Sequence, residues 1–289
     1  MPTSIPQQSG PHKSGQRSVL ITGCSTGIGF CLAKGLSEAG FHIIASCRNP
    51  KDEAKVKTLG VDVINLDLAS SLSIRNGVKQ AMELSNGLIY GLINNGAYGQ
   101  AGAIEDLSRD AVRAQFETNV FGTMELTNLI LPKMRAQNEG RIVQISSVLG
   151  IVCLPYRGAY NASKYALEAL TDTLRLELSD TNIRLSLIEP GPIESAFRKN
   201  SLARFYQYID PNESVHKENY RAMKARLDKS ENSRFTLPPE AVLAVVEHAL
   251  TSNKPKIRYA VTIPTKVMAP LKRLLPDRIM DKFLLANGG

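Results

Sequence analysis

The chain has 289 residues, of which 43% are hydrophobic, and its 35 basic side chains exceed its 27 acidic ones for a net charge of +8. This length and composition are enough for one domain with a full core. Its apolar runs fall short of the ~20 residues that cross a bilayer, so we expect a soluble protein. Nucleic-acid binding is not expected, because the basic excess is spread along the chain and concentrates only near the C-terminus.

Residues 1–17 are rich in Pro, Gly, Ser and Gln and lack the apolar core of a signal peptide. We expect a disordered arm there, followed by a single domain over residues 18–289. The four cysteines show neither CxxC pairing nor histidines at metal-ligand spacing. They indicate reduced thiols, no metal site and a cytoplasmic location.

From residue 18 onward, short β-rich runs alternate with segments of helical period. The runs are SVLIT, HIIASC, VDVINLD, LIYGLINN, GRIVQIS, IRLSLIEPG and KIRYAVTI. Two long helical segments span residues 111–137 and 156–180. Strands that alternate with helices indicate right-handed βαβ units. The predicted fold is therefore α/β, a Rossmann-like doubly wound parallel sheet of about seven strands with helices on both faces.

Two segments interrupt this alternation. Residues 196–235 form a long polar and charged stretch, which we expect to be a substrate lid. Residues 263–289 have apolar side chains near helical period and predict a C-terminal helical tail. The tail is divided by Pro264, Pro270 and Pro276, which favours packing on the domain and closure of the pocket. Contact of this basic tail with an anionic membrane surface is the alternative.

Three glycines follow the first predicted strand and open a helix. Gly23, Gly27 and Gly29 can adopt steep backbone angles or let a ligand approach the chain closely. A helix N-terminus presents unpaired N–H groups and the positive end of its dipole, which suits a pyrophosphate. A tight turn without a ligand is the alternative, and the βαβ context favours a dinucleotide.

The end of the second predicted strand indicates which dinucleotide binds. An acidic residue there bonds a ribose 2′-hydroxyl, whereas an arginine accommodates a 2′-phosphate. The sequence has Arg48 at this point and no carboxylate before Asp52, which favours NADP over NAD, although an ordinary exposed arginine is the alternative. Asp67 could accept a hydrogen bond from an adenine amino group or cap the next helix, and Asn94 could bind the cofactor or tie strand ends together.

Tyr160 and Lys164 are four residues apart on a predicted helix and so lie on one face. Ser147 follows a strand, at the sheet edge where such folds bind ligands. An ammonium ~4 Å from the phenol would lower the tyrosine pKa by roughly three units. Tyr160 would then exchange protons near neutral pH, and Ser147 would bond the substrate oxygen.

These motifs resemble those of the short-chain dehydrogenase/reductase superfamily over residues 18–262. TGCSTGIG is similar to its TGxxxGxG turn and YNASK to its YxxxK motif. The resemblance implies that Tyr160 is the acid/base, that Lys164 holds the ribose hydroxyls and that Ser147 positions the carbonyl. Asn119 resembles the helix asparagine that holds a water for proton relay.

The resemblance also implies a cofactor site. Its residues are Gly23, Ser25, Thr26, Gly27, Ile28, Gly29, Arg48, Asp67, Leu68, Asn94, Gly96, Tyr160, Lys164, Pro190, Gly191, Ile193 and Ser195. Two positions depart from the family pattern. The NNAG motif is altered at Gly96 and Ala97, and Thr26 replaces the basic residue of some NADP-dependent members, so the expectation of NADP rests mainly on Arg48.

The segment from SLIEPGPI to the tail is similar to bacterial NADP-dependent aldehyde reductases related to the 17β-hydroxysteroid and retinol dehydrogenase branch. That similarity implies an apolar aldehyde substrate, medium- to long-chain or isoprenoid. Candidate pocket residues are Tyr98, Leu149, Val152, Leu154 and Phe197, which could equally belong to the core. A hydroxysteroid or retinol-type alcohol dehydrogenase and a non-catalytic NADP sensor are the alternatives. Members often pair through the two long helices, so we expect a homodimer or homotetramer.

Overall fold

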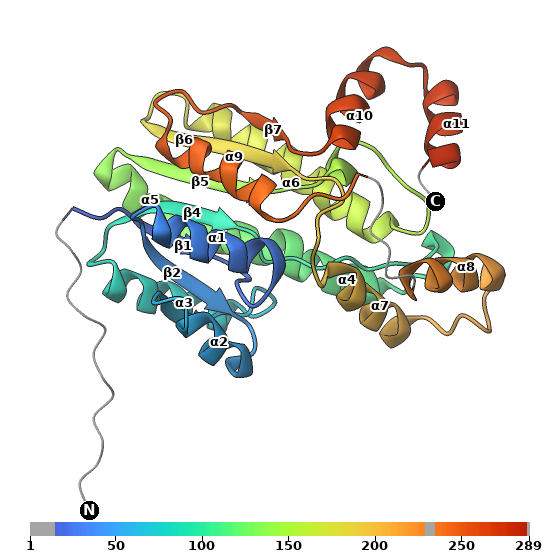
Figure 1. Cartoon of the computed structure of the whole chain (residues 1–289), viewed down its shortest axis with the longest axis horizontal. Coiled ribbons are helices and arrows are strands. Elements are labelled where there is room, and N and C mark those ends of the chain that lie inside the picture. Colours follow the sequence, from blue (N-terminus) through green and yellow to red (C-terminus); the bar gives the residue numbers. More distant parts are fainter. Residues whose placement is uncertain (1–14, 229–234, 288–289) are drawn as a thin grey trace, which may run out of the picture.

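The computed structural model describes residues 15–228 and 235–287, and within them seven parallel strands form one sheet in the order β3-β2-β1-β4-β5-β6-β7 (Figure 1). The strands are β1 (Ser18–Ile21), β2 (His42–Cys47), β3 (Asp62–Asn65), β4 (Ile89–Asn94), β5 (Gly140–Ile145), β6 (Ile183–Glu189) and β7 (Arg258–Ala260). The strand order changes direction at β1, between β2 and β4, as in doubly wound folds. The predicted fold class is confirmed.

Helices cover both faces of this sheet because its strands are apolar on both sides. In β1, Val19 and Ile21 pack in one core cluster with α1 (Gly27–Glu38) and α9 (Glu240–Thr251). Leu20, between them, packs in a second cluster with α3 (Ser71–Leu84) and α5 (Gly122–Gln137). Each fully buried aliphatic side chain of this kind contributes about 1.5–3 kcal/mol.

The remaining elements connect the strands or follow them. They are η1 (Pro50–Asp52), α2 (Glu53–Lys57), η2 (Ile104–Asp106), α4 (Arg109–Phe116), the π-helical turn η3 (Glu117–Phe121), η4 (Val148–Gly150), α6 (Gly158–Glu177), α7 (Phe197–Tyr208), α8 (Lys217–Asp228), α10 (Ile263–Leu274) and α11 (Asp277–Asn287). The one long helix predicted over residues 111–137 is interrupted by η3.

Four of these helices lie toward the carboxyl ends of the strands (Figure 1). The predicted lid, residues 196–235, contains α7 and α8, and its residues 229–234 lie outside the described part of the chain. The tail contains α10 and α11. The two segments that break the βαβ alternation therefore lie beyond the carboxyl ends of the strands.

The predicted arm, residues 1–17, lies mostly outside the described residues. Arg17, at its end, contacts the domain: its Nη2 is 2.8 Å from Oε1 of Glu139, and its guanidinium lies 4.2 Å from the ring centroid of Tyr90. In the ranges that the structure covers, no helix has both the length and the apolar character to span a bilayer. Those ranges also contain no cluster of three or more metal-ligating His, Cys, Asp or Glu side chains.

Candidate active site

The glycine turn between β1 and α1 is tight enough to require its glycines. Gly23 and Gly27 have φ angles of +71° and +57°, which side-chain-bearing residues rarely adopt. A Cβ on Gly29 would lie 2.2 Å from the carbonyl oxygen of Gly23, and one on Gly23 would lie 2.7 Å from Cα of Gly96. The first turn of α1 has no acidic residue, so its N-terminal dipole is open to an anion.

Asn95, which directly follows β4, stabilises this turn. Its Nδ2 donates to the carbonyl oxygens of Thr22 (2.9 Å) and Gly23 (3.1 Å), and the Thr22 hydroxyl accepts from the Gly96 N–H (2.8 Å). Asn94, which the sequence predicts either to bind the cofactor or to tie strand ends together, donates from Nδ2 to the Thr127 hydroxyl on α5 at 3.0 Å, and its contact with a cofactor stays a prediction. Of the two asparagines, Asn95 supports the glycine turn and Asn94 ties β4 to the helix layer.

The ends of β2 and β3 supply a cation and a carboxylate. Arg48 is exposed directly after β2, and its carbonyl accepts from Nδ2 of Asn65 at 3.1 Å. Asp67 accepts from the Ala69 N–H at 3.0 Å, while Ser70 caps α3. Ser70 and not Asp67 therefore caps α3, and the Asp67 side chain lies in the loop between β3 and α3.

Lys55 is a second cation beside the glycine turn, and the motifs do not indicate it. Its Nζ donates to the carbonyl of Ser25 at 3.3 Å and lies 4.8 Å from the ring centroid of Phe30. The only sequence signal is its position on α2, which follows Arg48 by a few residues. Ser25, Thr26 and Ile28 lie in the glycine turn and at the start of α1, as predicted from the motif.

The segment after β6 lies against the glycine turn. A Cβ on Gly27 would be 2.9 Å from the Ser195 Cβ, and one on Gly191 would be 2.2 Å from the Thr262 hydroxyl. Ile193 forms a bridge with Leu237, and the Pro190 carbonyl accepts from Val148. Leu68 packs beside Gly96. The surface formed by the glycine turn and the segment after β6 therefore has glycines where a dinucleotide would approach the backbone, and these residues fit such a cofactor.

The catalytic candidates meet where β5 ends and α6 begins. Ser147 caps η4 by accepting from the Leu149 N–H at 3.1 Å and hydrogen-bonds to Tyr160. Lys164, one helical turn after Tyr160, donates from Nζ to the carbonyl oxygen of Ile145 at 2.7 Å. Tyr160 and Ser147 are each 9% exposed and Lys164 is 3% exposed. The structure thus brings the predicted triad together in a largely buried site.

Burial dominates the electrostatics of this pair. Burial raises the pKa of Tyr160 to about 12, and the hydrogen bond from Ser147 and the charge of Arg157 only partly oppose it. Burial lowers the pKa of Lys164 to about 8, against the opposing charge of Glu168. Nζ of Lys164 lies 5.7 Å from the tyrosine ring centroid. In the protein alone, burial is therefore the largest effect on the Tyr160 pKa, and a lowering of that pKa by Lys164 stays a prediction.

Asn119 lies in the π-helical turn η3 and joins three parts of the site. Its Oδ1 accepts from the Tyr98 N–H (3.2 Å), and its Nδ2 donates to the Tyr98 carbonyl (3.0 Å) and to the Ser163 hydroxyl (3.1 Å). Single π-helical turns are frequent at functional sites. The side-chain amide of Asn119 thereby fixes the loop after β4 to the catalytic helix, and the role in water relay stays a prediction.

An apolar cluster surrounds Tyr160. It contains Leu149, Val152, Leu154 and Phe197, and also Met280 and Leu284 of the tail. The Phe197 ring centroid is 5.4 Å from that of Tyr160. Tyr98 lies outside this cluster, with the Arg204 guanidinium 4.8 Å from its ring centroid. Four of the five predicted pocket residues therefore share one cluster. The two tail residues also belong to it, although the sequence analysis did not identify them.

A carboxylate network lies behind Lys164. Nη2 of Arg258 is 3.1 Å from Oε2 of Glu168 and 2.6 Å from Oδ2 of Asp172, and its Nε is 3.2 Å from Oε1 of Glu189. Glu189 is 2% exposed. Burial and the charge of Glu168 raise the Glu189 pKa to about 7, although Arg258 opposes this. The Arg258 guanidinium thus compensates the negative charge of three carboxylates near Lys164.

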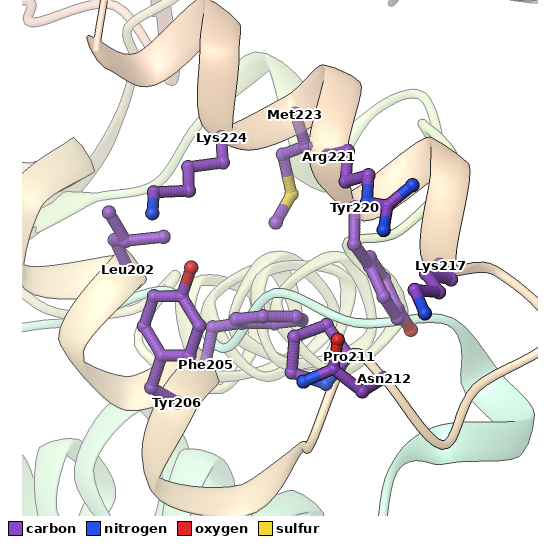
Figure 2. Close-up of a pocket in the computed structure, with 10 residues that line it drawn as sticks. All are labelled: Leu202, Phe205, Tyr206, Pro211, Asn212, Lys217, Tyr220, Arg221, Met223 and Lys224. Atoms are coloured by element: carbon purple, nitrogen blue, oxygen red, sulfur yellow. The ribbon is translucent and has the colours of Figure 1, made fainter.

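A separate small cavity lies between α7 and α8 (Figure 2). Its volume is about 60 Å³. Phe205, Tyr220 and Met223 are among its lining residues, together with the basic Lys217, Arg221 and Lys224. None of the residues that line it is a candidate catalytic residue, so this cavity is distinct from the candidate active site.

Comparison with known proteins agrees with this geometry. The family model described as short chain dehydrogenase matches residues 17–204, and the chain belongs to that family of oxidoreductases. It is 44% identical over 269 residues to the uncharacterized oxidoreductase YbbO of Escherichia coli (strain K12), covering 93% of this chain and 94% of that protein.

Other relatives have named activities. The chain is 33% identical to a 3-ketodihydrosphingosine reductase of Bacteroides thetaiotaomicron (91% of this chain, 94% of the relative) and 32% identical to human retinol dehydrogenase 8 (89% and 85%). A short chain dehydrogenase/reductase from Burkholderia phymatum in complex with NAD has a similar fold, with a TM-score of 0.77, 22% identity, and 92% and 95% of the two chains covered. The resemblance to the superfamily and to its retinol dehydrogenase branch is confirmed.

Proposed function

We propose that the protein reduces apolar aldehydes, medium- to long-chain or isoprenoid, to primary alcohols with NADPH. The observation that carries this proposal is the apolar cluster in which Tyr160 is buried, with Leu149 and Val152 on one side and Met280 and Leu284 of the tail on another. An apolar substrate gains about 25 cal/mol for each Å² that it buries in such surroundings. The cytoplasm is the proposed location.

Each residue of the site has its own role in this reduction. Bound NADPH supplies the hydride. Tyr160 donates its phenolic proton to the carbonyl oxygen, and Ser147 hydrogen-bonds the same oxygen as negative charge develops on it. Lys164 holds the ribose and stabilises the phenolate that remains. Asn119 orients the loop at Tyr98 and supports return of the proton from solvent.

The choice of NADPH rests on Arg48. A guanidinium at the end of β2 suits a 2′-phosphate, and Lys55 adds a second positive charge near the glycine turn. Neither β2 nor the loop up to Asn49 carries a carboxylate that would bond the 2′-hydroxyl of NAD.

The family relationship supports a second candidate, oxidation of a retinol-type or hydroxysteroid alcohol, because retinol dehydrogenase 8 is among the relatives. The same residues would act in reverse, with Tyr160 as the base. A sensor that binds NADP without turnover is the third possibility, and it leaves the arrangement of Ser147, Tyr160 and Lys164 without a purpose.

The proposal includes self-association through the two long helices. Val112 and Phe116 of α4 and Phe121 of η3 line a shallow apolar hollow, and Phe121 is 51% exposed. A homodimer or homotetramer would cover this surface. Phe121→Ser should lower the mass measured by sedimentation equilibrium, and an unchanged mass would place the contact elsewhere.

The test of activity is the initial rate of NADPH loss with octanal, all-trans-retinal and a 17-ketosteroid, with NADH run alongside. Loss of a general acid costs about 10²–10⁴-fold in rate, so Tyr160→Phe should abolish turnover. Tyr206→Phe, which removes an exposed hydroxyl on α7, is the matched control. Tight NADPH binding without turnover of any carbonyl would reject the proposal in favour of the sensor, and preferred turnover of the ketosteroid would favour the second candidate.

A further inference from the structure

An exposed apolar stripe runs along the tail helix α10. Ile263, Val267, Pro270 and Leu274 follow the spacing i, i+4, i+7, i+11, which places them on one helix face. All four side chains are exposed, and Leu274 is 78% exposed. A contiguous exposed apolar face of this kind marks an interaction site.

The inward side of the tail is already filled. Met268 and Leu271 of α10 and Met280 and Leu284 of α11 belong to the cluster around Tyr160. Met280 is 1% exposed. The tail is therefore packed on the active site through one side, and the exposed stripe is a second apolar surface that remains after this packing is complete.

Two further features of the tail accompany the stripe. On α11, Ile279 and Leu285 are 52% and 68% exposed. Over residues 263–287 the sequence has five basic and two acidic residues, a net charge of +3. The exposed basic side chains are Lys266, Lys272, Arg273, Arg278 and Lys282.

Helix α7, which Figure 1 shows apart from α10 and α11, adds further positive charge at this end of the molecule. It contributes Arg198, Lys199 and Arg204 with no acidic residue, and it lies at the same end of the sheet (Figure 1). The segments 197–208 and 263–287 together hold a charge of +6, most of the net +8 of the whole chain. The end of the molecule that holds the active site is thus both apolar and strongly basic.

Charge complementarity selects the partner. A second copy of the chain docked through this face would bring two basic surfaces together, which costs free energy. An anionic phospholipid bilayer offers negative headgroups for the lysines and arginines and acyl chains for the stripe. Figure 1 shows α10 and α11 at the margin of the molecule beyond the carboxyl end of β7, where a flat surface could reach them.

We infer that α10 and α11 dock the protein reversibly on an anionic phospholipid surface. The docking stands on the exposed stripe and its basic surroundings alone. That an apolar carbonyl then passes from the bilayer between the tail helices to Tyr160 rests on the proposed function.

The test is cosedimentation of the full-length protein with vesicles, in the absence of NADPH and of any carbonyl. Vesicles of phosphatidylcholine with about one third phosphatidylglycerol should pellet the protein, and pure phosphatidylcholine should not. Raising the salt concentration to about 0.5 M should weaken the binding, because exposed charges are then screened. The double variant Val267→Ser with Leu274→Ser should lower the partition coefficient about tenfold or more, since burial of each CH₂ is worth about 0.8 kcal/mol.

The matched control is Leu88→Ser with Ile257→Ser. These side chains are 58% and 44% exposed and lie at the opposite end of the sheet, directly before β4 and β7. This variant should bind as the wild type does. Absence of wild-type binding to the anionic vesicles, or equal losses in both double variants, would overturn the inference. A fall in the solution mass of the tail variant would also overturn it, because the stripe would then be an interface between copies. Since no turnover is measured, failure here and failure of the proposed reduction are distinguishable.

Discussion

Removal of the Arg258 side chain should destabilise the protein in a way that depends on pH. Arg258 contacts Glu168, Glu189 and Asp172, and the side chains of the first two carboxylates are only 10% and 2% exposed. Arg258→Met keeps the length of the side chain and leaves these carboxylates uncompensated. Breaking a buried ion pair costs about 3–5 kcal/mol. Since the Arg258 side chain is itself 33% exposed, solvent screening reduces this to about 3 kcal/mol at pH 8.

The sign of the pH dependence follows from Glu189. Its pKa of about 7 in the folded protein lies above the ordinary value of 4.5, so between these values the folded state binds more protons than the unfolded state. The free energy of unfolding therefore falls as the pH rises through this range. Loss of Arg258 raises this pKa further and extends the fall to higher pH. At pH 5.5 the carboxyl group is largely protonated, and the destabilisation should be about half of that at pH 8 or less.

Urea unfolding of the wild type and of Arg258→Met at pH 5.5 and pH 8 measures this difference. Arg113→Met is the control, because Arg113 and Asp110 form an exposed pair with side chains 59% and 80% exposed. It should cost less than about 0.5 kcal/mol at both pH values. A destabilisation by Arg258→Met that is equal at the two pH values, or larger at pH 5.5, would refute the assignment of the network as charged carboxylates held by one guanidinium.

Three further outcomes are expected. Arg48→Ala should reduce the preference for NADPH over NADH in kcat/KM about ten- to hundredfold, as loss of a charge-assisted hydrogen bond does. Arg75→Ala on α3 should leave this preference unchanged. Equal effects of the two substitutions would remove the case for a 2′-phosphate site. Gly29→Ala should destabilise the fold by about 1–3 kcal/mol in urea unfolding and abolish NADPH binding in a fluorescence titration, because its Cβ would meet the Gly23 carbonyl, and wild-type binding would show that the turn can relax. A thiol reagent should label the exposed Cys153 rapidly in the native protein and leave Cys24, whose thiol pKa is raised by burial, unlabelled until unfolding; equal labelling rates would contradict this burial.

The strands were predictable because each is a continuous apolar run bounded by turn residues. The run HIIASC coincides with β2, and the glycine turn and the YNASK motif lie where their local spacing placed them. Tyr160, Lys164 and Ser147 are close in sequence, so helical and strand geometry alone brings them together. Local patterns of this kind determine most of the fold and the reacting centre.

Contacts between distant segments were not predictable in the same way. Arg258 lies 90 residues from Glu168 in sequence, and they meet only because β7 joins the sheet beside β6. The sequence predicted that the tail packs on the domain, and Met280 does pack in the cluster around Tyr160, but no periodicity indicated which tail residues would do so. The pKa of Tyr160 is raised chiefly by burial, to which such remote segments contribute, so local spacing alone could not indicate this effect.

The π-helical turn at Glu117–Phe121 also constrains how this protein can change in length. A wider turn accommodates one residue more than an α-helical turn does, so the residues after it are rotated by about 100° relative to an uninterrupted helix. Leu126, Ile130 and Met134 of α5 are fully buried in this rotated frame. Deleting a single residue from the turn would restore a regular helix and leave these three side chains facing the sheet, because the wider turn absorbs one residue. The deletion would instead displace Asn119, whose amide joins the Tyr98 backbone to Ser163. The extra residue therefore serves the position of Asn119 and not the packing of α5, so a deletion here should disturb the site more than the fold.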